Sequence, residues 1–529
     1  MRILCLCACM CVAVATIRAE EQGAVLVTIS DPATWVVGDL SRYVGQTVEF
    51  AAPWYLCNNY NGSYYISPRR LYSPTNQEFP LSSEYNSLLS LNKNGSVRLT
   101  GVSGYHRTGE RLCNLIVKVS STSSVSLVDC NWVGNKRSDL DKGPDMSQID
   151  MRGTHTLLVC GMNLEYYLVE DFGTGYGPDN ASDHARQRQK ISKALAAINA
   201  DIYGLVEVQQ GQGAMEEIAN DLTKNTGRKF TYIDDGSSIS GSYTKSGYVY
   251  CSDVVQPMGK YRYNNTGVSR RKYLQAFKQL SNNECFIFSI NHFKAKSGGG
   301  SATGDDVDKG DGQGAFNGTR VREAQSVLSS YESNRAYYND SDLLIMGDLN
   351  AYAMEDPITT LTRGGMIDLH RHFHADSSYS YSYRGEVGYL DHALCNSTML
   401  PQVTGMVGYH INSDELDDYT YDKSNDVTMY RCSDHDPILV GLNLNRTVVS
   451  LQPYIVNEDA AIVSNNQIEV KNANGGQLRV YDIQGTLMMD EPIRSDSEIF
   501  STFALPQGIY IVHLYAQGKV VNQKFRILR

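Results

Sequence analysis

The feature that most constrains the fold is an alternation of apolar and amphipathic segments within residues 154–445. Apolar runs of strand length occur at 157–162, 202–206, 286–291, 343–346, 389–394 and 438–442. Between the first two runs, Gln187–Asn199 carries apolar side chains at helical spacing. Strands that alternate with helices predict an α/β core for this part of the chain.

The segments on either side of this core have a different pattern, which predicts β structure. Residues 24–135 contain alternating polar and apolar stretches such as Gln46–Phe50, separated by Gly, Ser and Asn clusters. We expect a small β-barrel or sandwich there. Residues 455–529 contain several short strand-like runs, which predict a C-terminal β-sandwich. The polar stretch 136–153 has no clear period and is interpreted as a linker.

The first 19 residues have the pattern of an export signal. Arg2 precedes the apolar run Ile3–Ala15, and small residues follow. That run is too short to span a bilayer, and no second apolar stretch of sufficient length follows. We expect a secreted or cell-surface protein without a transmembrane segment. Lipidation at Cys9 or Cys11 is the alternative.

Export also bears on the cysteines, because disulfides persist in oxidising compartments. Eight cysteines lie beyond the signal: Cys57, Cys113, Cys130, Cys160, Cys251, Cys285, Cys395 and Cys432. None forms a CxxC pair, which argues against a zinc site. Disulfides are expected among the eight, with Cys251–Cys285 and Cys395–Cys432 as candidate pairs. Buried free thiols are the alternative.

The formal net charge is -11, so the chain has no overall basic excess for binding a polyanion. A polyanionic partner would therefore need a local compensating charge, and a bound cation is the simplest candidate.

Polar residues of the central segment recur at the ends of the predicted strands, where open α/β sheets bind ligands. They are Asn163, Glu207, His292, Asp348, Asn350, Asp391, Asp434 and His435. Carboxylates and amides suit Mg²⁺, with Ca²⁺ and Mn²⁺ as alternatives, and histidines suit proton transfer or phosphate contact. A hard cation, a base and charge-stabilising donors are what hydrolysis of a phosphodiester requires.

The order and spacing of several short strings resemble the endonuclease/exonuclease/phosphatase superfamily, in particular the large nucleases that bacteria secrete. The strings are Asn291–Lys294, Gly310–Gly314 with Asn317 and Arg320, Gly347–Asn350, Tyr389–Leu394, His410–Glu415 and Ser433–Pro437. The resemblance implies a four-layer α/β sandwich of the deoxyribonuclease I-like fold. The start of the N-terminal domain, Asp39–Phe50, resembles an OB-like domain.

The resemblance also implies roles for individual residues. Glu207 is expected to be the main metal ligand, with Asn163 and Asp434 near the ion. Asp348 is expected to activate water or relay its proton, and Asp391 to support a histidine.

Three residues are expected to act on the substrate. Asn350 would orient the phosphate, and His292 and His435 would contact it or exchange protons. Arg320 is a candidate phosphate ligand, with an internal salt bridge as the alternative. Which group is the general base stays open.

Three other clusters have less specific patterns. The acidic loop residues Asp305, Asp306, Asp308 and Asp311 are a candidate Ca²⁺ site, with a solvated loop as the alternative. Glu165 is a further candidate for the metal site. His370, His372 and His374 alternate along the chain, and a loop without metal is expected for them.

The last 75 residues or so resemble a type IX secretion sorting domain. The resemblance is carried by Val480–Asp482, Leu505–Tyr510 and the closing Lys524–Arg529. It implies the secretion machinery as a partner.

Together these features predict a secreted, monomeric phosphodiesterase that cuts DNA, with RNA as a further substrate. Two alternatives stay open: a phosphoesterase for a lipid or inositol phosphate, and a surface binding protein without activity.

Overall fold

The computed structural model forms two compact units, Met1–Asn445 and Arg446–Arg529, which are described separately. It describes residues 23–60, 63–235, 242–264, 270–444, 461–464, 467–471, 473–482, 486–502, 505–506, 508–516 and 519–527. The predicted signal, residues 1–19, lies outside these ranges.

Two six-stranded sheets form the centre of the first unit. One has the order β10 (Phe230–Tyr232), β11 (Thr244–Cys251), β9 (Ile202–Gln209), β8 (Leu157–Tyr167), β21 (Ile438–Leu442) and β20 (Val403–Gly408). The other has the order β12 (Val255–Asn264), β13 (Lys272–Gln279), β14 (Cys285–His292), β15 (Leu343–Asp348), β19 (Asp391–Cys395) and β16 (Ile367–Asp368).

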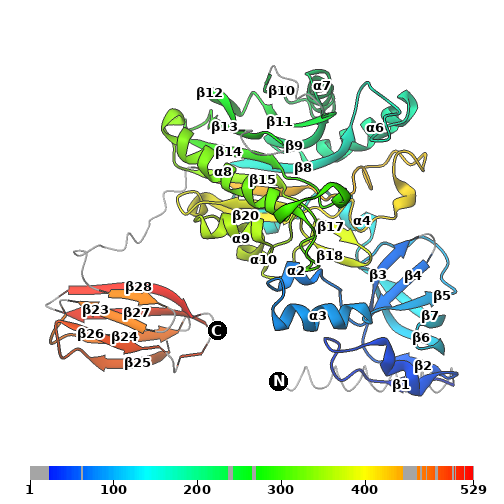
Figure 1. The fold of residues 1–529 in the computed structure, drawn as a ribbon, viewed down its shortest axis with the longest axis horizontal. Coiled ribbons are helices and arrows are strands. Elements are labelled where there is room, and N and C mark those ends of the chain that lie inside the picture. Colours follow the sequence, from blue (N-terminus) through cyan, green and yellow to red (C-terminus); the bar gives the residue numbers. More distant parts are fainter. Residues whose placement is uncertain are drawn as a thin grey trace. The chain divides into compact units, whose positions relative to one another are not determined.

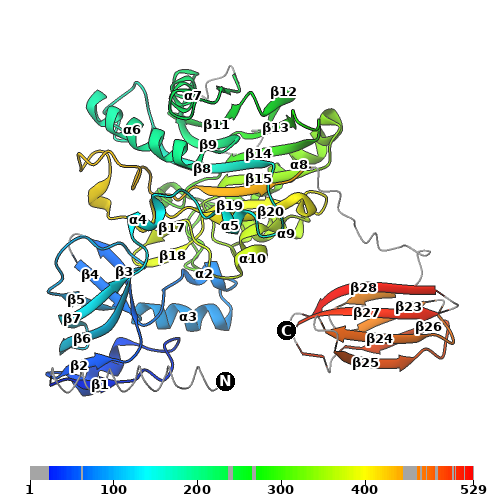
Figure 2. The same ribbon diagram turned by 180° about the vertical axis from the view of Figure 1, so that it is seen from behind.

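Apolar side chains of both sheets pack into one shared core, which includes Val206, Phe288 and Met346. Helices α6 (Ala181–Ile198) and α7 (Gly213–Thr226) cover the outer face of the first sheet. Helices α8 (Asn317–Tyr338) and α9 (Asp356–Arg363) cover the second (Figures 1 and 2). Because both faces of each sheet are covered, central strands such as β9, β14 and β15 are almost entirely buried. The predicted four-layer α/β sandwich is confirmed.

The N-terminal part folds as a small barrel below this sandwich in Figure 1. Its sheet has the order β1 (Val25–Val27), β2 (Thr47–Phe50), β6 (Arg111–Ser121), β3 (Trp54–Tyr60), β4 (Ser63–Ser67), β5 (Val97–Thr100) and β7 (Ser124–Val133). A further pairing of β6 with β7 closes the ring. Helices α2 (Pro74–Gln77) and α3 (Ser83–Lys93) connect β4 to β5. The predicted small β-barrel is confirmed.

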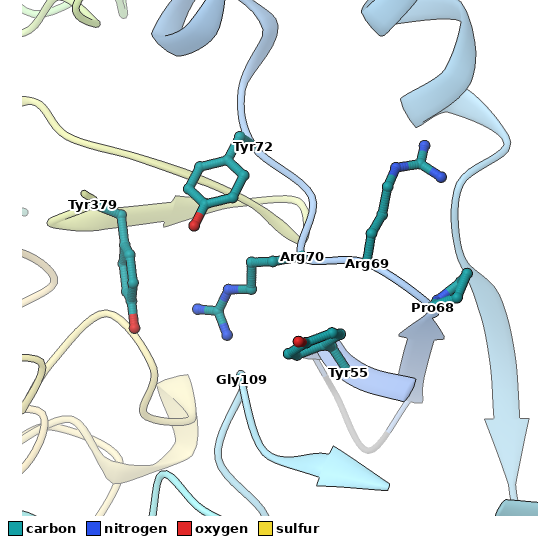
Figure 3. A pocket seen from close by; sticks show the side chains of 7 residues that line it. All are labelled: Tyr55, Pro68, Arg69, Arg70, Tyr72, Gly109 and Tyr379. Carbon is teal, nitrogen blue, oxygen red and sulfur yellow. The ribbon is translucent and has the colours of Figure 1, made fainter. Parts of the chain in front are cut away.

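Two adjacent acidic residues of the sandwich, Asp414 and Glu415, bind the barrel through buried charges. Arg70 Nη2 lies 2.6 Å from Asp414 Oδ1, and Arg107 Nε lies 2.6 Å from Glu415 Oε1. Figure 3 shows the Arg70 side chain extending toward Tyr379, whose ring it covers at 4.8 Å from the guanidinium carbon to the centroid. The string His410–Glu415 therefore holds two folded parts together.

The segment 136–153 is not the plain linker that its polarity indicated. It contains two short helices, α4 (Arg137–Leu140) and α5 (Met146–Ile149). Ile149 is fully buried in the core, and Arg137 Nη2 lies 2.6 Å from Glu415 Oε2. The polar residues of this segment serve contacts with the sandwich, which a period-based interpretation does not detect.

The expected disulfides do not form, because all eight cysteines of the described part are free thiols. Cys160, Cys251, Cys395 and Cys432 are fully buried, and burial raises the pKa of the Cys395 and Cys432 thiols to about 12. These cysteines pack as small apolar side chains.

The second unit is a sandwich of a three-stranded and a four-stranded sheet. The sheets have the orders β22 (Ala461–Ser464), β23 (Gln467–Lys471), β26 (Ser497–Ser501) and β25 (Leu487–Pro492), β24 (Gln477–Asp482), β27 (Gly508–Ala516), β28 (Lys519–Ile527). Val470, Val480 and Val512 contribute to its core. The predicted C-terminal β-sandwich is confirmed. Among the described residues, no helix combines the length and apolarity needed to cross a bilayer.

The buried ion pair of Glu415 yields a stability prediction. Glu415→Gln leaves the fully buried Arg107 without its counter-charge, so we expect the free energy of unfolding to fall by about 3–5 kcal/mol. Denaturant unfolding measures it. The matched control is Glu332→Gln, which breaks the exposed pair with Arg335 and should cost less than about 1 kcal/mol. If both substitutions lowered the free energy of unfolding by the same amount, the buried pair of Arg107 and Glu415 would stabilise the fold no more than an exposed pair, contrary to this prediction.

Candidate active site

Strand register brings the predicted residues to one end of the two sheets. His292 on β14 pairs in register with Asp348 on β15, and Asp348 pairs with Asp391 on β19. Asn163 on β8 pairs with Val206, the residue before Glu207 on β9. Side chains that are distant in sequence therefore lie at the same level of the sandwich.

They meet at a cavity of about 1130 Å³. Seven of the predicted residues line it: Asn163, Glu207, His292, Asp348, Asn350, Asp434 and His435. Asp391 lies behind His435, and Arg320 does not line the cavity. The barrel contributes to the lining through α2 and α3, by Thr75, Tyr85 and Leu89.

His435 is fixed by a buried carboxylate. Its Nδ1 lies 2.6 Å from Asp391 Oδ2, and the Ser380 hydroxyl donates to that same oxygen at 2.7 Å. The other ring nitrogen, Nε2, lies 3.9 Å from Asp348 Oδ2 and 3.9 Å from Asp434 Oδ2. Burial alone would lower the pKa of His435, but Asp391, Asp434 and Asp348 outweigh it and raise the pKa well above its usual value. These three carboxylates therefore favour the cationic form of the imidazole.

Asp348 is held by a tight turn. Its Oδ1 accepts a hydrogen bond from the Asn350 backbone N–H at 2.8 Å, and its Oδ2 accepts from Asn163 Nδ2 at 3.1 Å. Gly347 has a φ of +124°, and a Cβ there would lie 2.0 Å from the Asn291 carbonyl oxygen. This position therefore requires glycine. Burial is the main cause that raises the pKa of Asp348 to about 6. The charge of His435 lowers this pKa, and the charge of Asp391 raises it further.

Glu207 has a left-handed backbone conformation, with a φ of +61°. Its Oε2 accepts from the Tyr166 backbone N–H at 3.0 Å, and its Oε1 lies 3.5 Å from His292 Nε2. Burial, followed by the charge of Asp434, raises the pKa of Glu207 to about 7. A strained conformation of a non-glycine residue is typical of functional sites.

His292 differs from His435 in its charge. Burial is the main cause that lowers the pKa of His292 well below its usual value, and the positive charges of Arg270 and His435 add to this. Its Nε2 lies 3.6 Å from Asp348 Oδ2. One neutral and one cationic imidazole therefore border the same carboxylate.

Two further residues line the cavity: Arg270, which the sequence analysis did not identify, and Glu165, which it named only as an additional candidate. Arg270 lines the cavity, and its Nη1 donates to the Phe293 carbonyl at 2.8 Å. Nothing in the sequence distinguishes it from other surface arginines. Glu165, which we considered as an additional metal ligand, also lines the cavity. Burial and the charge of Asp434 raise the pKa of Glu165 to about 8.

The structure does not bring Arg320 to the cavity with the other predicted residues. Arg320 is fully buried, and its guanidinium donates to the carbonyls of Ala315 at 2.8 Å and Gln313 at 2.7 Å. These contacts tie the Gly-rich loop to α8 through hydrogen bonds to backbone carbonyls.

The acidic loop does not assemble the candidate Ca²⁺ site. Asp305 pairs with Arg322, Asp306 accepts from Thr319, and Asp311 accepts from Gln313. The three histidines His370, His372 and His374 do not lie on the expected loop, because they belong to the helix α10 (Leu369–His374), and His370 is buried. His370 Nε2 lies 3.0 Å from the Asp391 carbonyl oxygen, and His374 Nε2 lies 2.7 Å from that of Met406.

The donor chemistry of the cavity fits a hard divalent cation. Glu165, Glu207, Asp348 and Asp434 place four carboxylates around it, and Asn163 adds an amide. Burial raises the pKa values of Glu207 and Asp348 to about 7 and about 6, and a cation beside these groups would favour their charged forms. Glu165 Oε2 is also buried without a hydrogen-bond partner. Within the described ranges, no three His, Cys, Asp or Glu side chains form a preassembled ligand set.

Comparison with known families agrees with this geometry. The sequence profile of the Endonuclease/Exonuclease/phosphatase family matches residues 172–435, and that of the Secretion system C-terminal sorting domain matches residues 462–528. No curated protein matches the chain.

Several solved structures are similar to the chain. The human Nocturnin catalytic domain shares 13% identity at a TM-score of 0.37, covering 56% of this chain and 95% of that one. TDP2 of D. rerio, complexed with a single strand DNA product, shares 14% at 0.36, covering 54% and 98%. A mannosyl-6-phosphatase of Bacteroides thetaiotaomicron shares 17% at 0.34, covering 54% and 100%.

The sorting domain implies that the protein is secreted or displayed at the cell surface. The catalytic part belongs to a family of hydrolases that act on phosphoester bonds. Residues 172–435 are thus a domain of the endonuclease/exonuclease/phosphatase family, joined to a C-terminal secretion sorting domain.

Proposed function

We propose that this protein is a secreted, divalent-metal-dependent phosphodiesterase that hydrolyses extracellular DNA, with RNA as a further substrate. The observation that supports this most is the meeting of four carboxylates, a cationic histidine and a neutral histidine in one cavity. Such a set can hold a cation, move a proton and stabilise negative charge.

Glu207, Asn163 and Asp434 are the residues that would hold the cation, with Mg²⁺ as the expected ion and Ca²⁺ or Mn²⁺ as alternatives. When bound, the ion would offset the negative charge that develops on the phosphate. Glu207 has one carboxylate oxygen fixed by the Tyr166 N–H, which orients the other toward His292.

The remaining residues would act on the proton and the phosphate. Asp348 is the proposed acceptor for the proton of the attacking water, because its raised pKa lies near the operating pH. His435, kept cationic by Asp391, would stabilise phosphate charge or donate a proton to the leaving oxygen. Asn350 and His292 would orient the phosphate. The Asn350 amide is already fixed, since its Nδ2 donates to the Phe293 carbonyl at 3.1 Å.

The first prediction concerns catalysis. Asp348→Asn keeps the shape of the turn but removes the proton acceptor, and His435→Ala removes the cation. Each should lower cleavage of plasmid DNA by about 10²–10⁴-fold. The control Asp305→Asn, which changes a carboxylate paired with Arg322 outside the cavity, should retain activity. Release of phosphocholine from sphingomyelin without nucleic acid cleavage would favour the lipid alternative instead.

A second prediction concerns the pH profile. If His435 acts as the cation, activity falls as the pH rises through its pKa, which Asp391 helps to raise. Asp391→Asn should therefore move the alkaline limb of the kcat/KM profile to lower pH by about 1–3 units. Asp340→Asn, a half-buried carboxylate outside the cavity, should leave the limb in place. An unchanged limb in Asp391→Asn would rule out this role for the pair.

A third prediction concerns metal and stability. The pKa values of Glu207 and Asp348 are about 7 and about 6, above those of an unfolded chain. Between pH 5.5 and 8 the metal-free native state therefore binds more protons than the unfolded state, so these groups make stability fall as the pH rises. Bound cation relieves this repulsion.

The increase in Tm caused by Mg²⁺ should accordingly be larger at pH 8 than at pH 5.5. Thermal unfolding with Mg²⁺ and with EDTA at each pH measures this increase. Glu207→Gln should remove most of that difference, and Asp305→Asn should preserve it. A Tm response to Mg²⁺ that is identical in Glu207→Gln would place the ion elsewhere.

A further inference from the structure

Beside the carboxylates, the cavity wall contains a stacked pair of tyrosine rings that hydrolysis itself does not require. Tyr166 on β8 and Tyr176 in the connection to α6 both line the cavity. Their ring centroids are 4.9 Å apart at an interplanar angle of 23°. The ring of Tyr243 continues the row, 6.2 Å from that of Tyr176. We call Tyr166, Tyr176 and Tyr243 the tyrosine row.

The first residue of the tyrosine row, Tyr166, contacts Glu207 directly: the Tyr166 backbone N–H donates a hydrogen bond to the Glu207 carboxylate at 3.0 Å. Glu165 and Tyr166 have φ values of +52° and +53°, so two successive residues adopt the left-handed conformation. Such conformations are strained for residues other than glycine and persist only where the surrounding structure enforces them. At Gly177, a Cβ would lie 2.5 Å from the Tyr166 carbonyl oxygen, so the connection can pack against Tyr166 only with glycine there. The backbone that orients Glu207 therefore also fixes the first ring.

The outer rings of the row are exposed although they are large and apolar. Tyr176 is 52% exposed and Tyr243 is 47% exposed. About half of each of these two side chains is therefore accessible to a ligand. Two further rings line the cavity near the other end of the predicted catalytic set: Tyr381 lies 4.7 Å from the His435 ring, and Tyr383 is 54% exposed. Exposed aromatic faces thus border the catalytic residues on both the Glu207 and the His435 elements.

We propose that the tyrosine row, through Tyr166 and Tyr176, stacks an unpaired base of a nucleic acid strand next to the phosphate that is cut. This inference rests on the proposed function and narrows it, because it makes single-stranded nucleic acid the preferred substrate.

Three considerations favour this ligand. The bases of a duplex are stacked on one another and do not offer a face to a protein ring, whereas an unpaired base does. The net charge of -11 gives little general attraction for phosphates, so another source of affinity is needed. Stacking on an aromatic ring supplies about 1–3 kcal/mol per base. Because every base has such a face, the row would act without strong sequence preference.

The test compares a labelled single-stranded oligonucleotide with its duplex, using the full chain with Mg²⁺. Tyr176→Ala should lower kcat/KM on the single strand by about 10- to 100-fold, mainly through KM, since stacking binds substrate and does not act on the reacting atoms. Tyr176→Phe keeps the ring and should recover most of the loss. The matched control is Tyr263→Ala: Tyr263 is 44% exposed and stacked on Tyr261, but lies outside the cavity lining, so its loss should leave kcat/KM unchanged.

A second measurement separates stacking from a merely structural effect of Tyr176. Oligonucleotides with a single abasic nucleotide at successive positions are cleaved by the wild type and by Tyr176→Ala. For the wild type, kcat/KM should fall by about 10- to 100-fold when the abasic nucleotide occupies the position that stacks on the tyrosine row. For Tyr176→Ala, an abasic nucleotide at that same position should leave kcat/KM unchanged.

Two failures are distinguishable. If the wild type cleaves nucleic acid but single strand, duplex and every abasic strand are cut equally well, the stacking inference is overturned while the proposed function stands. If the wild type cleaves no nucleic acid and releases phosphate from a phosphorylated sugar or lipid instead, both the stacking inference and the proposed function are overturned.

Discussion

The crowding of carboxylates at one end of two buried sheets is the constraint on which the rest of the site depends. Glu165, Glu207 and Asp348 are partly or fully buried, and burial is the main cause that raises their pKa values to about 8, 7 and 6. Asp434 is among the causes of the first two shifts. A fold that only needed stability would not gather acidic groups in this way, because each unpaired buried charge is costly. The arrangement is consistent with selection for a bound cation and for proton transfer, and it is compensated by contacts elsewhere.

One such compensation comes from the barrel. Asn412 Nδ2 donates to the His435 carbonyl at 2.6 Å, and the backbone N–H of Ser413 donates to Asp436 at 3.0 Å. The next two residues, Asp414 and Glu415, are the ones that bind the barrel arginines. The loop that carries His435 is therefore stabilised from outside the sandwich, and the N-terminal domain supports the catalytic part as well as lining its cavity.

The sequence was most informative where chemistry follows strand register. Polar residues at strand ends must converge in an α/β sheet, so the gathering of Asn163, Glu207, His292, Asp348 and His435 could be predicted without coordinates. The roles assigned to them remain proposals. The burial of a charge cannot be predicted in the same way, and nothing in the sequence indicated that Arg320 would be fully buried outside the cavity lining.

Other features depend on contacts between residues far apart in the chain, or on backbone conformations that leave no mark in the sequence. The ion pair of Arg107 with Glu415 joins positions roughly three hundred residues apart in the printed sequence. Glu165 and Tyr166 adopt the left-handed backbone conformation that positions the tyrosine row. Neither residue is a glycine or an asparagine, the types that favour this conformation, so the sequence does not predict it. The C-terminal strings correctly indicated a sorting domain. The expectation of disulfides was wrong for the described residues, because the amino-acid composition does not distinguish buried free thiols from paired cysteines.

The most direct test of the central claim is a crystal structure of the protein soaked with Mn²⁺, whose anomalous scattering locates the ion. The account predicts one strong peak in the cavity, within about 2.0–2.3 Å of a Glu207 oxygen and bordered by Asn163 and Asp434. A peak confined to the acidic loop around Asp305–Asp311, or no peak in the cavity at saturating Mn²⁺, would contradict it.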